Sequence, residues 1–93
     1  MRNQLLEVTA IIQGNVQGVG FRAATKRLAD RLQVTGFVRN LPNGDVELCA
    51  QGEKAQLELL LSELKREFSS HIAKITSTIH SASSTYPDFK IIH

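Results

Sequence analysis

The sequence predicts an α+β protein with a ferredoxin-like βαββαβ fold, a two-layer sandwich whose mostly antiparallel sheet carries two helices on one face. Two segments repeat apolar residues at helical spacing, and the segments around them alternate apolar and polar residues. Right-handed crossovers then bring both helices to the same face of the sheet. The length of 93 residues suits one domain, which we expect over residues 1–93.

The first half of the chain predicts a strand at 5–13, a helix at 21–32 and a strand at 34–40. Alternation defines the first strand, and a stripe at i, i+4, i+7 and i+11 defines the helix. The side chains expected to face the core are Leu6, Val8, Ala10 and Ile12 on the strand and Phe21, Thr25, Leu28 and Leu32 on the helix.

A hairpin joins the strand at 34–40 to a third strand at 45–51. Its connection, Leu41-Pro42-Asn43-Gly44, suits a type I turn followed by a bulge, because glycine tolerates the left-handed position. Alternation in the third strand directs Val46, Leu48 and Ala50 toward the helices. Glu47 and Cys49 then face the open side of the sheet, where we expect an exposed but passive thiol.

The second half continues with a helix at 54–67 and a strand at 72–80. The helix carries a leucine stripe on one side and charged residues on the other. A polar connection at 81–86 precedes a short strand at 89–92, a candidate extra edge strand.

Composition and charge argue against several classes of function. A net charge of +2 is too small to indicate nucleic-acid binding, and no apolar run approaches the ~20 residues of a membrane span. A single cysteine excludes an internal disulfide, and the N-terminus does not resemble a signal peptide. We therefore expect a cytoplasmic monomer that binds neither membrane nor nucleic acid.

The glycine-rich segment between the first strand and the first helix is the best candidate for chemistry. Gly14, Gly18 and Gly20 permit backbone conformations that turn successive N–H groups inward, and the helix start adds further free N–H groups. Arg22 lies in the first helical turn, where a cation is unfavourable unless it has an anionic partner. The segment predicts an anion site; the alternative is a tight loop with Arg22 directed to solvent.

Other catalytic patterns are missing from the sequence. The glycine segment lacks the G-K-[ST] of a Walker A loop and the third glycine of a dinucleotide fingerprint. His71, His80 and His93 do not have the spacing of metal ligands, and the carboxylates are scattered. We expect neither a metal nor another cofactor.

Two motifs resemble the signatures of the acylphosphatase family. Residues 12–22 match the first signature without a mismatch, and residues 36–40, 44–46 and Gly52 match the second. The segment 89–91 is similar to the closing F-x-I of the family, so the resemblance covers nearly the whole chain.

The resemblance implies a small metal-free enzyme that hydrolyses the carboxyl–phosphate bond of a small-molecule acyl phosphate. It implies Arg22 as the phosphate-binding arginine and Asn40 as the residue that positions water. It also implies a phosphate cradle in the backbone of Val16, Gln17, Gly18, Val19, Gly20, Phe21 and Arg22. Without the resemblance, Asn40 is more simply a hairpin-entry residue that caps backbone groups, and we favour a structural role for the Gln17 side chain.

Two features leave alternatives open. Ala23 and Ala24 stand where many relatives carry a larger residue, and we expect them to widen the leaving-group side. The cradle also suits a regulatory module that binds phosphate or carbamoyl phosphate without turnover. RNA binding on the open sheet face is a third hypothesis, weakened because Phe37 is the one aromatic residue in the two hairpin strands.

Overall fold

The computed structural model describes residues 5–93, and its elements follow the predicted order. The five strands form one sheet in the order β4-β1-β3-β2-β5. Every pairing is antiparallel except that of β5 with β2, which is parallel. The predicted ferredoxin-like fold is confirmed, and β5 extends it at the edge formed by β2. The elements are β1 (Leu6–Gly14), α1 (Phe21–Leu32), β2 (Thr35–Asn40), β3 (Val46–Gly52), α2 (Lys54–Glu67), β4 (Ile72–Ser81) and β5 (Phe89–Ile92).

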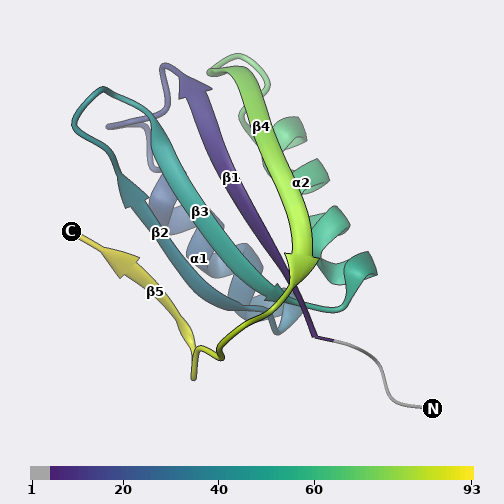
Figure 1. The fold of residues 1–93 in the computed structure, drawn as a ribbon. Coiled ribbons are helices and arrows are strands. Elements are labelled where there is room, and N and C mark those ends of the chain that lie inside the picture. Colours follow the sequence, from purple (N-terminus) through teal and green to yellow (C-terminus); the bar gives the residue numbers. More distant parts are fainter. Residues whose placement is uncertain (1–4) are drawn as a thin grey trace.

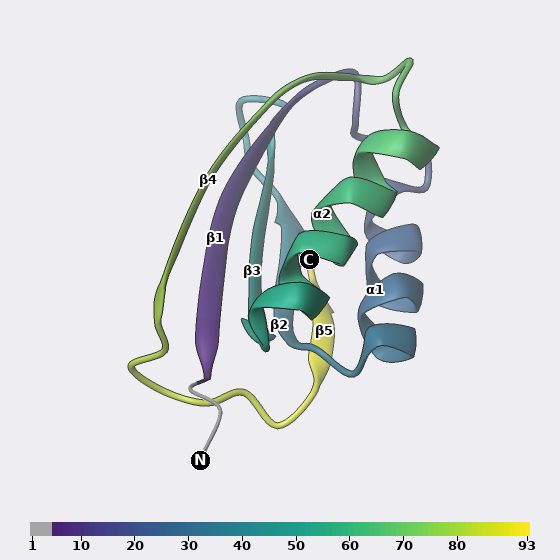
Figure 2. The same cartoon turned by 90° about the vertical axis from the view of Figure 1, so that its right-hand side faces the viewer.

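Both helices cover one face of the sheet, and the core lies between these two layers (Figures 1 and 2). The predicted inward residues of β3, Val46, Leu48 and Ala50, are fully buried. The two helices contribute Phe21, Ala24, Leu28, Ala29, Leu57, Leu60 and Leu64 to the same cluster. Within residues 5–93, neither helix is long and apolar enough to cross a bilayer.

The hairpin turn has the predicted geometry. The Gly44 amide donates to Leu41 O at 3.1 Å, and the Leu41 amide donates to Asp45 O at 2.8 Å. Gly44 has a φ of 97°, the left-handed conformation expected at this position. The Asn43 Oδ1 atom accepts a hydrogen bond from the Asp45 amide at 3.0 Å. This bond stabilises the turn that follows Asn40, the last residue of β2.

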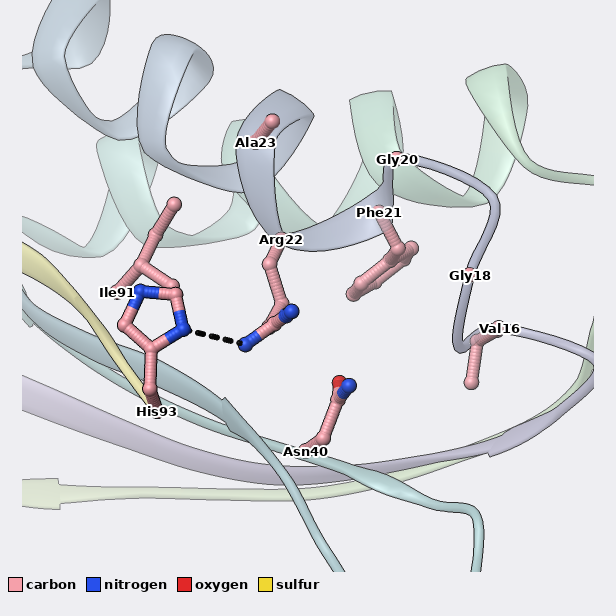
Figure 3. Close-up of a pocket in the computed structure, with 9 residues that line it drawn as sticks. All are labelled: Val16, Gly18, Gly20, Phe21, Arg22, Ala23, Asn40, Ile91 and His93. Carbon is pink, nitrogen blue, oxygen red and sulfur yellow. Dashed lines mark hydrogen bonds between the residues drawn. The ribbon is translucent and has the colours of Figure 1, made fainter.

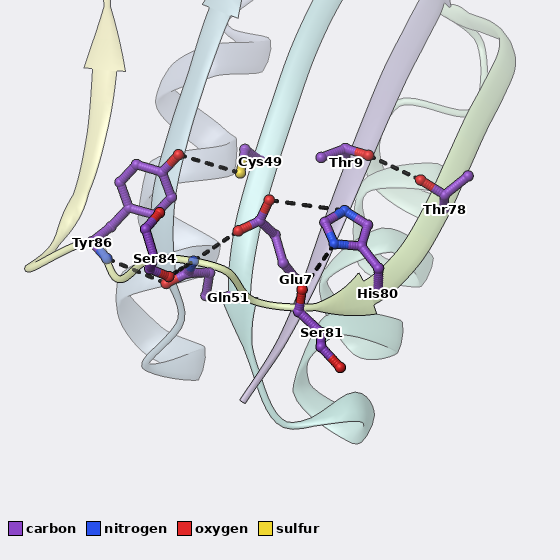
Figure 4. A network of polar contacts seen from close by, with 9 residues as sticks. All are labelled: Glu7, Thr9, Cys49, Gln51, Thr78, His80, Ser81, Ser84 and Tyr86. Atoms are coloured by element: carbon purple, nitrogen blue, oxygen red, sulfur yellow. Dashed lines mark hydrogen bonds and ion pairs between the residues drawn. The ribbon is translucent and has the colours of Figure 1, made fainter. Parts of the chain in front are cut away.

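Residues 82–88, which we call the strap, run from β4 across the open face to β5 (Figures 1 and 2). Gln51 on β3 fastens the strap: its Oε1 accepts the Tyr86 amide at 3.2 Å, and its Nε2 donates to Ser84 O at 2.5 Å. The same Nε2 donates to Glu7 Oε1 at 2.8 Å (Figure 4). The strap therefore joins β5 to the centre of the sheet through one buried amide.

The prediction of an exposed Cys49 is wrong. Cys49 does face the open side, but Tyr86 of the strap covers it, with 3.9 Å between Sγ and Oη, and only 4% of the residue is exposed (Figure 4). Burial raises the pKa of the Cys49 thiol to about 11. The thiol is thus neutral and shielded at physiological pH, and both properties favour the passive role expected for it.

Candidate active site

A pocket of about 180 Å³ opens where the β1–α1 loop meets the end of β2 and the end of β5 (Figure 3). The loop and the start of α1 form one side of it, and the ends of the two parallel strands form the other. The residues that line the pocket are Val16, Gly18, Gly20, Phe21, Arg22, Ala23, Asn40, Ile91 and His93.

Two glycines shape the loop side of this pocket. Gly18 and Gly20 have φ values of 79° and 81°, which L-residues with a side chain adopt only with strain. A Cβ atom at either position would meet no atom within 4 Å. The backbone conformation rather than crowding therefore requires glycine, and the space in front of the loop backbone stays open.

The first turn of α1 presents backbone donors to the pocket. Gly20 is the N-cap, no side chain caps the helix, and the bond from the Ala24 amide to Gly20 O, at 3.0 Å, is the first of the helix. The amides of Phe21, Arg22 and Ala23 precede that bond and lie at the positive end of the helix dipole. An anion in the pocket would be stabilised by both features.

Arg22 points into the pocket from the first turn of α1 (Figure 3). That turn contains no acidic residue, and the partner recorded for the guanidinium within residues 5–93 is His93, with 3.4 Å between Nη1 and Nδ1. The alternative of an Arg22 directed only to solvent is wrong. A guanidinium that no carboxylate of the described chain neutralises remains available to an anionic ligand.

Asn40 faces Arg22 across the pocket from the last position of β2 (Figure 3). Its Oδ1 atom is buried and has no hydrogen-bond partner among the residues that the structure describes. A buried amide oxygen without a partner is costly in a folded protein. The hairpin-cap alternative leaves this oxygen unexplained, whereas a bound water or ligand would satisfy it.

Gln17 connects the two sides of the site from outside the pocket. Its Nε2 donates to Leu41 O at 2.9 Å and to Asp45 O at 2.8 Å. The structural role favoured for this side chain is confirmed. The contacts tie the glycine loop to the turn that directly follows Asn40, so the loop and the amide hold a fixed separation.

Most of the predicted site residues line the same pocket, and a few lie outside it. Val16, Gly18, Gly20, Phe21, Arg22 and Asn40 line one pocket, whereas Gln17 and Val19 do not line it. Ala23 lines the pocket, so the expectation that it widens the leaving-group side stays a prediction. Ala24 does not line the pocket, because its side chain is buried in the core.

Ile91 and His93 belong to the site and were not predicted. Both come from β5 and the position after it, and they reach the pocket because Val38 pairs with Ile91 and Arg39 with Ile92 in the parallel ladder. A short apolar segment predicts a strand but not its neighbour in the sheet. Ile91 belongs to the F-x-I segment that resembles the family, but neither this segment nor His93 indicated a position beside the pocket.

Comparison with known proteins agrees with this geometry. The family model described as acylphosphatase matches residues 8–91. The acylphosphatase of Paenarthrobacter aurescens is 38% identical over 93 residues, covering 99% of each chain. The crystal structure of acylphosphatase from Bacillus subtilis superimposes with a TM-score of 0.86 at 28% identity, covering 95% of this chain and 99% of that one.

A larger protein contains a similar unit. The structure of HypF from T. kodakarensis matches with a TM-score of 0.79 at 25% identity, over 92% of this chain but only 12% of that chain. The family model and the full-length relative together settle the classification. This chain is a member of the acylphosphatase family of enzymes.

Proposed function

We propose that this protein hydrolyses the carboxyl–phosphate bond of acyl phosphates to a carboxylate and inorganic phosphate, without a metal ion. One observation carries the proposal: Arg22 and the first residues of α1 line the same pocket as Asn40, whose Oδ1 has no hydrogen-bond partner within residues 5–93. Hydrogen-bond donors that suit a phosphoryl group, on Arg22 and the first turn of α1, thus lie opposite the Asn40 oxygen, which can accept a hydrogen bond from water.

The phosphoryl group would bind on the α1 side of the pocket. The guanidinium fork of Arg22 matches two phosphoryl oxygens. Further donors would be the backbone amides of the loop and helix residues that line the pocket, Val16, Gly18, Gly20, Phe21 and Arg22. A phosphoryl-transfer transition state spreads charge over the equatorial oxygens, so fixed donors stabilise it without rearranging. Gly18 and Gly20 keep the loop backbone open to these oxygens.

Asn40 would orient the attacking water. Its Oδ1 accepts a hydrogen bond from the water and directs a lone pair of the water oxygen toward phosphorus. An amide is a poor base, so the proton passes to a phosphoryl oxygen of the substrate as the new P–O bond forms. The bond between phosphorus and the carboxyl oxygen breaks, and the carboxylate leaves with the bonding electron pair.

The leaving group explains why this small set of residues suffices. A carboxylate is a weak base whose conjugate acid has a pKa of about 4, so it departs without a general acid. Arg22 and Asn40 line the pocket, and none of the described residues that line it is a carboxylate. Phosphate monoesters of alcohols need more help with departure, and we expect them to react far more slowly.

The deciding experiment measures hydrolysis of benzoyl phosphate with excess EDTA. We expect turnover that EDTA does not reduce, competitive inhibition by inorganic phosphate, and little release of p-nitrophenol from p-nitrophenyl phosphate. Arg22→Ala prepared in parallel corrects for contaminating phosphatases. Activity that disappears with EDTA and returns with magnesium would reject the metal-free proposal.

The chain also resembles a segment of full-length HypF, whose crystal structure is of a phosphate- and nucleotide-bound form. This likeness favours a second candidate, a module that binds a phosphate-containing ligand without turnover. Titration with inorganic phosphate during the hydrolysis assay separates the two candidates. Binding to wild-type protein without hydrolysis of any acyl phosphate tested would favour the module.

A further inference from the structure

His93 lines the candidate pocket although it is far from the glycine loop and from Asn40 in the sequence. The parallel register of β2 and β5 pairs Arg39 with Ile92, so residue 93 lies next to Asn40. From there the imidazole extends to the guanidinium of Arg22, with 3.4 Å between Nδ1 and Nη1 (Figure 3). One side chain of β2 and one beyond β5 therefore flank the same arginine.

The direction of this hydrogen bond follows from chemistry. A guanidinium has only N–H donors, so the imidazole nitrogen that faces it must accept. In this contact Nδ1 of His93 carries no proton, and the ring proton lies on Nε2. The imidazole is thus a neutral acceptor in the contact with Arg22.

Three other arginines of the described chain pair with carboxylates. Arg27 pairs with Glu67, Arg39 with Glu47 and Arg66 with Glu63. Arg22, which lines the pocket, is held by a neutral ring instead. A carboxylate in that place would compete with the phosphoryl group for the same cation, whereas an imidazole leaves the positive charge unpaired.

We propose that His93 is a positioning residue for Arg22: its neutral Nδ1 orients the guanidinium toward the pocket without cancelling the charge that binds the phosphoryl group. This proposal rests on the proposed function of the site. It assigns His93 no contact with the substrate; the side chain acts through Arg22, by restricting the rotamers of a long flexible side chain before the ligand arrives.

Three substitutions at one position separate orientation from charge. His93→Asn keeps a neutral acceptor, because the amide Oδ1 occupies the same place along the side chain as Nδ1. His93→Phe keeps a ring but removes the acceptor. His93→Asp keeps an acceptor at that place and adds the negative charge that the proposal says must be avoided.

The KM for benzoyl phosphate should rank these variants. We expect KM within about twofold of wild type for His93→Asn, about fivefold higher for His93→Phe and more than tenfold higher for His93→Asp, with smaller changes in kcat. The increase for His93→Asp should shrink as salt is added, since salt screens an exposed ion pair, while that for His93→Phe should not. His80→Phe, which alters an exposed histidine on β4, is the matched control and should leave KM unchanged.

Two further measurements do not depend on turnover. Imidazole ¹⁵N shifts should show Nδ1 of His93 without a proton in the free protein, and titration with inorganic phosphate should rank the three variants as KM does. If wild type fails to hydrolyse acyl phosphates, the proposed function fails, yet the phosphate titration still tests His93. Wild-type phosphate affinity in both His93→Phe and His93→Asp, or a proton on Nδ1, would overturn the positioning role.

Discussion

Buried amide side chains differ in their hydrogen bonding between the pocket and the sheet surface under the strap. Under the strap, Gln51 uses both ends of its amide on Glu7, Ser84 and Tyr86, and its exposed fraction is 2%. In the pocket, Oδ1 of Asn40 is also buried but lacks a partner within residues 5–93. Two amide side chains on adjacent strands therefore have contrasting environments.

This difference indicates a structural role for Gln51 and a ligand-binding role for Asn40. A buried amide with all its hydrogen bonds stabilises the fold, whereas one without a partner destabilises the fold until a ligand arrives. The same contrast applies to the arginines, since Arg39 has a carboxylate partner on β3 and Arg22 has a neutral one beyond β5. The comparison predicts which substitutions reduce activity and which reduce stability.

Arg22→Lys should have the largest effect. Lysine keeps the charge but loses the planar fork that holds two phosphoryl oxygens, so we expect kcat/KM to fall about a thousandfold. The free energy of unfolding should stay within about 0.5 kcal/mol of wild type, since Arg22 makes no carboxylate pair in the described chain. Steady-state kinetics and urea unfolding measure the two quantities, and a loss below tenfold would contradict the assigned role.

Asn40→Ala should come next, with kcat about a hundredfold lower and KM nearly unchanged, because positioning of water acts mainly in the transition state. The same variant should be as stable as wild type or more stable, since it removes a buried oxygen without a partner. Asn40→Asp is the companion variant: its charge opposes the phosphoryl group, so KM should rise as well. Full activity in Asn40→Ala would show that the amide does not position water.

Gln51→Ala should have the opposite effect, a loss of stability with little change in activity. The change leaves the Tyr86 amide, the Ser84 carbonyl and the Glu7 carboxylate without their recorded partner, so we expect a loss of about 2 kcal/mol in the free energy of unfolding. The kcat of the folded protein should change less than threefold. A large fall in kcat without a fall in stability would mean that the strap network also serves catalysis.

The smallest effect concerns Cys49 and alkaline pH. Burial raises the pKa of this thiol from its ordinary value of 9.0 to about 11, so within this window the unfolded chain loses the proton and the folded chain keeps it. Stability contributed by the neutral thiol is therefore complete below pH 9 and declines as pH rises toward 11. Wild type should lose roughly 1–2 kcal/mol more than Cys49→Ala over that range in urea unfolding. Equal losses in the two proteins would show that the thiol ionises alike in both states.

Sequence reasoning succeeded where a local pattern carries the information. Alternation and helical spacing identify each strand and helix, and the turn at Pro42 and Gly44 follows from backbone preferences. The glycine loop and Arg22 could be singled out because loop, helix start and cation are consecutive in the chain. Asn40 required the resemblance to a family, since an asparagine before a hairpin is common.

It failed where distant segments meet. Cys49 was expected to be exposed because nothing in a polar connection shows that it crosses the sheet and places Tyr86 over β3. His93 was missed because a short edge strand can pair in more than one place. Ala24 was expected near the substrate together with Ala23, but successive helical residues are rotated by about 100°, so Ala23 lines the pocket and Ala24 faces the core.

The cover over Cys49 makes this thiol a built-in reporter. A reagent can reach the sulfur only after residues 82–88 lift away, so the rate of labelling under native conditions measures how often this segment detaches. Because the same segment leads into β5, such labelling would follow local opening next to the wall that carries Ile91 and His93, while the rest of the sheet stays intact.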